Sequence, residues 1–194
     1  MEQEGVIKYK QYWTVRKADF LSFDDPLIQA RDKLFQMGLI GEYKDTGVGY
    51  GNISKRFENN FIISGTQTGT IAHSKPHHYS LVTNFDIGTN TLHCRGPIKA
   101  SSEALTHGAI YNLSKRIQGV VHIHSQTLWK KHLYQLPTTS PDVPYGTAAM
   151  AKEIQHLFAG KNKNKNILVM AGHEDGIISF GEDLCDAMSL IEAL

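Results

Sequence analysis

The sequence GVVHIHSQ, residues 119–126, combines a strongly apolar run with two histidines at alternate positions. Its valines and isoleucine are apolar enough for a strand that is covered on both faces, which is typical of the centre of a layered protein. Side chains two positions apart point to the same side of a strand, so His122 and His124 are predicted to face one space. Two desolvated imidazoles need partners for their nitrogens, either hydrogen-bonding groups at the strand end or a metal ion.

The composition limits the classes of partner. The chain has 194 residues, enough for one well-buried domain, and its 20 Lys and Arg against 19 Asp and Glu give a formal net charge of +1. This balance provides no field that attracts nucleic acid or an anionic membrane, so we expect a small-molecule partner. No apolar run approaches the roughly 20 residues that span a bilayer, and the first residues lack a signal-peptide pattern, so a cytoplasmic protein is expected. Two cysteines outside any CxxC pattern indicate neither a disulfide framework nor a zinc-thiolate site.

The hydrophobic periodicity predicts helices around a series of short strands. Asp25-Pro26 begins the first helix, which Gly38 and Gly41 end, and Ser101 or Ser102 caps a second one. The remaining predicted elements are strands over 51–56, 61–64, 80–86, 91–94 and 167–171, helices over 127–133 and 147–158, and a final helix from about residue 181.

This order of elements predicts a layered α/β or α+β domain, in which helices flank a central, mostly antiparallel sheet. Residues 1–24 mix aromatic and charged side chains, and we expect them to form an N-terminal arm or an edge strand that packs on the body or on a neighbouring subunit. Residues 25–194 are expected to form a single domain.

Short polar motifs lie at the ends of the predicted elements, where sites tend to be built. Each motif alone is consistent with a turn or a cap, and Ser-Ser-Glu at the start of a helix is explained by capping and by the positive end of the helix dipole. In chain order they are GNIS (51–54), ISGT (63–66), ASSE (100–103), VHIH (121–124) and AGHEDG (171–176).

In this order the motifs resemble those of the class II aldolase/adducin family, over roughly residues 27–190. The chain carries GNIS, SGTQTG, ASSEALTHGAIY, VVHIHS, VPYG and LVMAGHEDGIISFG, and the Ser-Ser-Glu and His-x-His pair is the specific part. The resemblance implies an α/β fold with three layers (α/β/α), in which helices flank a central, mostly antiparallel sheet. It also implies a ring-like homotetramer with sites near the subunit interfaces.

The resemblance also implies a metal site, in which His122, His124 and His173 bind zinc, one ion per chain, and Glu103 is the acid/base residue. Three neutral imidazoles leave an open position on Zn²⁺, as in catalytic sites. Such an ion can act as a Lewis acid on the carbonyl and hydroxyl oxygens of a ketose, while a carboxylate moves the proton at carbon. Iron, cobalt and manganese remain alternatives to zinc.

A phosphate site is implied as well, because the family includes enzymes that act on sugar phosphates. None of its donors is Lys or Arg, which fits an anion held by backbone N–H and hydroxyl groups near a helix start. The resemblance places these donors at Asn52, Gly65, Thr66, Ser101 and Ser102.

The leading hypothesis is therefore a zinc-dependent sugar-phosphate aldolase-type lyase that cleaves a ketose phosphate through metal-stabilised enediolate chemistry. An epimerase or a methylthioribulose-1-phosphate dehydratase-like enzyme of the same family would use the same groups. A non-catalytic adducin-like interaction module is a further alternative, although such modules lack the metal ligands that this chain retains. A metal-dependent hydrolase would also use three histidines but would not explain the phosphate-type turns.

Overall fold

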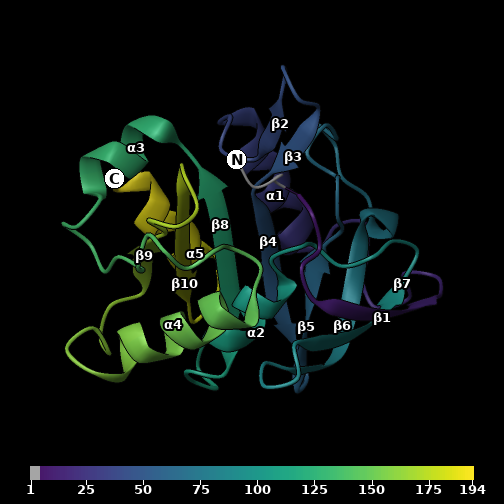
Figure 1. Ribbon diagram of the computed structural model, residues 1–194. Coiled ribbons are helices and arrows are strands. Elements are labelled where there is room, and N and C mark those ends of the chain that lie inside the picture. Colours follow the sequence, from purple (N-terminus) through teal and green to yellow (C-terminus); the bar gives the residue numbers. More distant parts are fainter. Residues whose placement is uncertain (1–4) are drawn as a thin grey trace.

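An eight-stranded sheet forms the centre of the molecule (Figure 1). The computed structural model describes residues 5–194, so residues 1–4 of the predicted arm lie outside the described residues. All strand pairs are antiparallel except the one at the first edge, which confirms the predicted sheet type. From edge to edge the strands are β1 (Lys10–Val15), β7 (Thr91–Gly96), β6 (Tyr79–Asp86), β5 (Asn60–Ser64), β4 (Asn52–Phe57), β8 (Gly119–His124), β10 (Gly176–Gly181) and β9 (Ile167–Val169).

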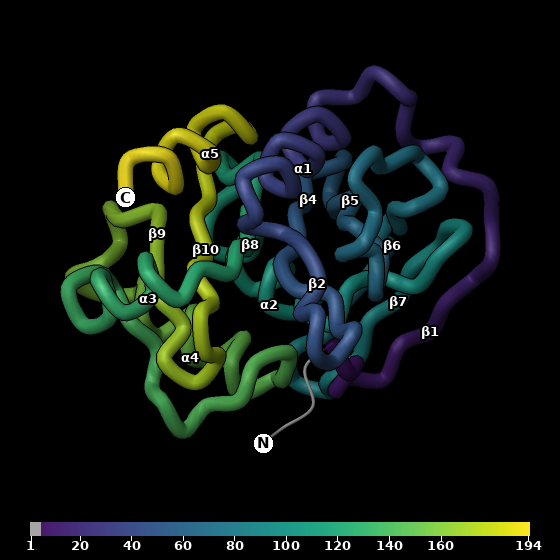
Figure 2. Tube along the Cα trace, turned by 90° about the horizontal axis from the view of Figure 1, so that it is seen from above, coloured from purple at the N-terminus to yellow at the C-terminus, as the bar shows by residue number. Residues whose placement is uncertain are grey.

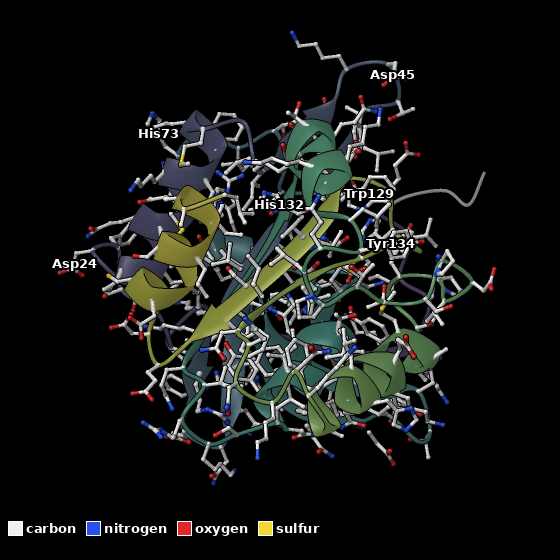
Figure 3. The ribbon with its side chains drawn as sticks, turned by 90° about the vertical axis from the view of Figure 1, so that its left-hand side faces the viewer. Asp24, Asp45, His73, Trp129, His132 and Tyr134 are labelled. Carbon is white, nitrogen blue, oxygen red and sulfur yellow. The ribbon has the colours of Figure 1, made fainter. Side chains whose placement is uncertain are left out.

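Helices cover both faces of this sheet, which confirms the three-layer α/β/α fold. Helices α2 (Ala104–Tyr111) and α4 (Ala148–Ala159) pack on one face, and α1 (Pro26–Gln36) and α5 (Leu184–Glu192) pack on the other (Figure 3). The short helix α3 (Gln126–His132) follows β8 and carries Trp129, whose Nε1 donates to the Met170 carbonyl at 2.9 Å (Figure 3). Among the described residues, no helix is long and apolar enough to cross a membrane.

Strand β8 is buried along its whole length. Val121 and Ile123 belong to the apolar core beneath α1 and α5, whereas Val120 belongs to the core beneath α2 and α4. Because side chains alternate along a strand, His122 and His124 lie on the face of α2 and α4. The two histidines therefore share one side of the sheet, as the sequence predicted.

Two strand regions differ from the prediction. Strands β2 (Gly41–Tyr43) and β3 (Val48–Tyr50) form a separate two-stranded hairpin, and β10 was not predicted either. The hairpin strands are only three residues long and contain glycine, which strands disfavour. The apolar run of β10 is too short for periodicity to assign, and its pairing with β8 and β9 decides its conformation.

The predicted cap of the second helix was wrong. Glu103, rather than a serine, occupies the N-cap position of α2, and its side chain makes no capping hydrogen bond. The Ser101 hydroxyl instead accepts from the Glu103 backbone N–H at 3.2 Å, so it bonds a residue that precedes the helix. The Glu103 carboxylate is therefore not used as a cap and belongs to the site described below.

The N-terminal segment joins the sheet at its edge. Strand β1 pairs in parallel with β7, and Figure 2 shows both at the outer side of the molecule. The buried hydroxyl of Tyr9 donates to the Ser101 carbonyl at 2.7 Å, and Gln11 Nε2 donates to the Ala100 carbonyl at 3.3 Å. The segment that enters β1 is thereby attached to the turn that precedes Glu103.

Gly51 provides a test of how tightly β4 is connected to the rest of the fold. Its φ is +72°, and an added Cβ would lie 2.8 Å from Ile40 Cγ1 and 3.0 Å from the Leu39 carbonyl. Gly47 has φ +69° but has no atom within 4 Å of an added Cβ. We expect Gly47→Ala to lower the free energy of unfolding by about 1 kcal/mol, and Gly51→Ala by about 3 kcal/mol, because only the second adds overpacking to backbone strain. Urea denaturation measures both, and equal losses would contradict the close packing at Gly51.

Candidate metal centre

Three buried histidines meet on the α2 and α4 face of the sheet. Each of His122, His124 and His173 offers one ring nitrogen, and these atoms all lie within 4.8 Å of one another. The ring centroids are separated by 4.9 Å (His122–His124), 5.1 Å (His122–His173) and 4.7 Å (His124–His173). The structure thus brings the three predicted ligands together in a group of the size that one metal ion can bridge.

His173 reaches this group from a turn between β9 and β10. Its backbone N–H donates to the Met170 carbonyl at 3.2 Å, and the N–H of Gly176 donates to the His173 carbonyl at 3.0 Å. An added Cβ on Gly176 would lie 3.2 Å from His122 Nε2 and 3.3 Å from His173 Nδ1. Glycine at this position therefore keeps the space between the two imidazoles open.

The electrostatics favour neutral imidazoles. Burial lowers the pKa of His122 and of His124 well below the usual value, and repulsion from the neighbouring histidines adds to this effect. Burial also lowers the pKa of His173 to about 3, with a smaller contribution from the positive charge of Lys8. At neutral pH each ring therefore carries a lone pair, which is the form that binds a metal.

Two polar side chains contact the outer nitrogens of the His-x-His pair. The Tyr43 hydroxyl lies 2.8 Å from His124 Nδ1, and the Asn52 side-chain amide lies 3.2 Å from His122 Nδ1. With Nδ1 protonated, Nε2 can act as a ligand, and a half-turn of the Asn52 amide brings its oxygen to accept that proton. In the described structure, His122 Nε2 and Asn52 Oδ1 are buried without a hydrogen-bond partner. The donor set therefore fits a divalent metal such as zinc, and binding would satisfy the orphaned nitrogen.

Glu103 places a carboxylate beside the histidines. Its side chain is only 2% exposed, and Oε1 lies 4.0 Å from His173 Nδ1. The backbone of Gly146 borders the same carboxylate, since an added Cβ there would lie 3.5 Å from Oε1. Next to Gly146, the ring of Tyr145 stacks on His173 with centroids 4.1 Å apart. The predicted acid/base residue thus lies beside His173, one of the predicted ligands, and next to the turn that contains Gly146.

The predicted phosphate donors line a single small pocket. Asn52 links this pocket to the histidines, because it also contacts His122. The described residues that line the pocket include no Lys or Arg, so an anion there would be bound by N–H and hydroxyl groups. They are Gly5, Gly49, Gly51, Asn52, Gly65, Thr66, Gln67, Thr68, Gly69, Ser101 and Ser102, which include all five predicted donors.

A second buried histidine network lies behind the cluster. His107 Nδ1 is 2.7 Å from the Ser54 hydroxyl, which is 2.9 Å from the Tyr111 hydroxyl. Burial and the nearby His122 lower the pKa of His107 well below the usual value. The neutral ring therefore packs beneath the sheet face as a hydrogen-bonded core residue.

The sequence reasoning missed Tyr43 and assigned no role to Tyr145. Tyr43 lies in the hairpin that was not predicted, so no pattern placed it near β8. Tyr145 lies in the VPYG motif, which is part of the family resemblance but did not indicate that Tyr145 contacts His173. Both tyrosines reach the histidines only through tertiary packing.

The fold and the site together define a class of protein. It is a layered α/β domain in which two histidines of a central strand meet a third histidine and a carboxylate from other segments. The family described as "Class II Aldolase and Adducin N-terminal domain" matches residues 37–194, and the chain belongs to this family. A comparison with curated proteins finds no match.

Several solved structures share the fold. The chain is similar to the crystal structure of YgbL from Klebsiella pneumoniae, a candidate aldolase/epimerase/decarboxylase, with 21% identity, a TM-score of 0.65, and coverage of 92% of this chain and 86% of the other. It is also similar to L-fuculose-1-phosphate aldolase from Thermus thermophilus, with 19% identity, a TM-score of 0.61, and coverage of 86% and 85%. The sugar-phosphate aldolase from Thermotoga maritima has 16% identity, a TM-score of 0.62, and coverage of 85% and 87%. At these identities the likeness establishes the fold.

The contact of Tyr43 with His124 predicts an effect on metal affinity. Tyr43→Phe removes the hydroxyl that orients the ring of a ligand, and we expect it to weaken zinc binding about tenfold or more. Tyr50→Phe is the matched control, because the Tyr50 hydroxyl donates to the Gly38 carbonyl instead of a histidine. Competition with a chelating dye measures both affinities, and an equal effect of the two variants would argue against a specific role for Tyr43.

Proposed function

We propose that the protein is a divalent-metal-dependent lyase of the aldolase type, which uses zinc to cleave a ketose phosphate. The observation that carries the proposal is the group formed by three neutral histidines, a buried carboxylate and an adjacent pocket of neutral donors. Membership of the class II aldolase family and the aldolase names of several fold relatives support the same reaction class.

In this proposal His122, His124 and His173 hold the metal. The bound ion would supply Lewis-acid chemistry, polarising a carbonyl and stabilising the negative charge that develops when a carbon–carbon bond breaks. Asn52 and Tyr43 orient two of the ligands through their outer nitrogens.

Glu103 is the residue that we propose to move the proton at carbon. Its carboxylate lies beside His173 and inside a buried environment, where little water competes for the proton. The chain positions it by the turn that contains Ser101 and Ser102, two residues that line the proposed phosphate pocket. Binding the phosphate would therefore fix the substrate next to the acid/base group.

An epimerase and a methylthioribulose-1-phosphate dehydratase-like enzyme would use the same residues, so product analysis must separate them from an aldolase. An adducin-like interaction module has no need for three neutral imidazoles that face one another. Burying them without a ligand leaves Nε2 of His122 unsatisfied, which is unfavourable.

We also propose that the protein assembles as a homotetramer, in keeping with the family resemblance. Sedimentation equilibrium measures the mass directly, and a monomer would contradict this part of the proposal.

The metal content tests the first requirement. We expect the purified protein to contain about one divalent metal per chain, and the His122→Ala/His124→Ala variant to contain almost none, because two of three ligands are lost. Elemental mass spectrometry measures both. A native protein that lacks metal and does not take up added zinc would contradict the enzyme proposal and favour an adducin-like module.

Removing the carboxylate tests the role of Glu103. We expect Glu103→Gln to keep the metal but to lower the turnover of a cleaved ketose phosphate by about 100-fold or more, because proton transfer loses its acceptor. Glu174→Gln is the control, since Glu174 is an exposed carboxylate next to His173. Chromatography of the products from a set of ketose 1-phosphates distinguishes cleavage, epimerisation and loss of water. Unchanged turnover in Glu103→Gln would remove Glu103 from the mechanism.

A further inference from the structure

Arg31 is a buried arginine on α1. Its side chain is only 1% exposed, although arginine normally lies at the surface of proteins. Nη2 donates to the Thr68 carbonyl at 2.7 Å, and Nη1 donates to the Ile71 carbonyl. Removing a guanidinium group from water is unfavourable unless its N–H groups find acceptors, so these two carbonyls fix the position of the side chain.

Both carbonyls belong to one turn beside the pocket lined by the predicted phosphate donors. The Ile71 N–H donates to the Thr68 carbonyl at 3.2 Å, and the Thr68 hydroxyl donates to the Gly65 carbonyl at 2.9 Å. Thr68 and Gly69 line the pocket, whereas Arg31 is not among its described lining residues. Arg31 therefore contacts this turn from outside the pocket.

The contact with Arg31 sets the direction of a neighbouring backbone N–H. A trans peptide group is planar, so its carbonyl and its N–H point in opposite directions. The Thr68 carbonyl points to Arg31, and the N–H of Gly69 therefore points away from it. Gly49 also lines the pocket, and an added Cβ there would lie 3.2 Å from the Gly69 nitrogen. The Gly69 nitrogen thus lies beside a second lining residue of the pocket.

Other backbone donors of the pocket are already used within the fold. The N–H of Gly65 donates to the His78 carbonyl at 2.8 Å, and the N–H of Thr66 donates to the Lys99 carbonyl at 3.0 Å. Among residues 5–194 no hydrogen bond from the Gly69 N–H is found, although Gly69 is buried. Buried backbone N–H groups are normally paired, so an anion in the pocket would supply the acceptor that this one lacks.

The charge of Arg31 is offset within α1. Asp32 Oδ1 lies 3.5 Å from Arg31 Nη1, and the same carboxylate accepts from the Ser74 N–H at 2.9 Å and from the Ser74 hydroxyl at 2.8 Å. Opposite charges this close together leave little net charge to attract an anion from a distance. Arg31 would therefore act on the pocket through the orientation of the turn rather than through a positive field.

We propose that Arg31 is a positioning residue of the phosphate pocket, which holds the Thr68 carbonyl and thereby directs the Gly69 N–H at a bound phosphate. This inference rests on the proposed phosphate site, and it assigns a residue on α1 that does not itself touch the ligand. A guanidinium group suits this role because its planar fork can hold two carbonyls in a fixed geometry, whereas a lysine ammonium group is a point charge on a flexible chain.

Two probes that differ only by a phosphate test the proposal on the zinc-loaded protein. Glycolohydroxamate binds zinc through its hydroxamate oxygens, and its phosphate ester adds the group that the pocket would bind. We expect the wild-type protein to bind the phosphate ester more tightly in isothermal titration calorimetry. Arg31→Met should weaken binding of the ester about tenfold, because a hydrogen bond to a charged group is lost, and should change the affinity for glycolohydroxamate less than about twofold.

Two further variants separate positioning from charge and from stability. Arg31→Lys keeps the charge without the planar fork and should still bind the ester weakly, and full recovery of ester binding would overturn the positioning role. This variant also tests the proposal if Arg31→Met does not fold. Leu27→Ala removes a buried side chain elsewhere on α1, and we expect it to lower the melting temperature but to keep the preference for the ester. An equal loss of ester binding in Leu27→Ala would overturn the inference, because destabilisation of α1 would then be sufficient.

The remaining outcomes distinguish this inference from the proposed function. An unchanged preference for the ester in zinc-loaded Arg31→Met would overturn this inference alone. A zinc-loaded wild-type protein that binds both probes equally would overturn the proposed phosphate pocket as well, and a wild-type protein that takes up no zinc would overturn the proposed metal site. Elemental mass spectrometry of each titrated sample measures the zinc content.

Discussion

The burial of two imidazoles on one face of β8 is the constraint on which the rest of the structure depends. A buried neutral imidazole must have partners for its nitrogens, and His122 and His124 obtain them from opposite directions. Their outer nitrogens contact Asn52 on the next strand and Tyr43 on the hairpin. Each of the two rings also offers a nitrogen to a group that includes His173. The neighbouring strand β4, the hairpin and the turn after β9 together supply the partners of these two histidines.

The two faces of the sheet have different roles, one in stability and one in the candidate site. The face beneath α1 and α5 is filled by aliphatic side chains such as Val121 and Ile123, and their burial stabilises the fold. The opposite face carries the histidines only at the carboxyl end of β8, while α2 and α4 cover its apolar remainder. Glycine at position 176 then leaves the room that the imidazoles need. Because successive side chains point to opposite faces, one strand can contribute core residues on one face and candidate metal ligands on the other.

Segments from distant parts of the chain close the site. The N-terminal segment attaches to the turn before Glu103 through Tyr9, and it brings Lys8 to the ring of Tyr145. The hairpin borders the pocket lined by the predicted phosphate donors through Gly49, while Tyr43 contacts His124. Because the same short elements contact the pocket, the carboxylate and the ligands, the position of a substrate in one part constrains the geometry of the others.

The sequence by itself determined the layers, the antiparallel sheet and the common face of the two strand histidines, because hydrophobic periodicity and strand alternation are local properties. The order of its motifs also indicated His173, Glu103 and the five pocket residues. Their convergence, however, depends on a register between strands that are far apart in sequence, and β10 was missed for the same reason. The hairpin was missed because its strands are short and contain glycine, and the cap of α2 was wrong because Glu103 occupies the N-cap position. Only the tertiary structure decided that Tyr43 and Tyr145 contact the histidines and that Lys8 reaches the ring of Tyr145, since no local pattern encodes a contact between a loop or terminal segment and a distant strand end.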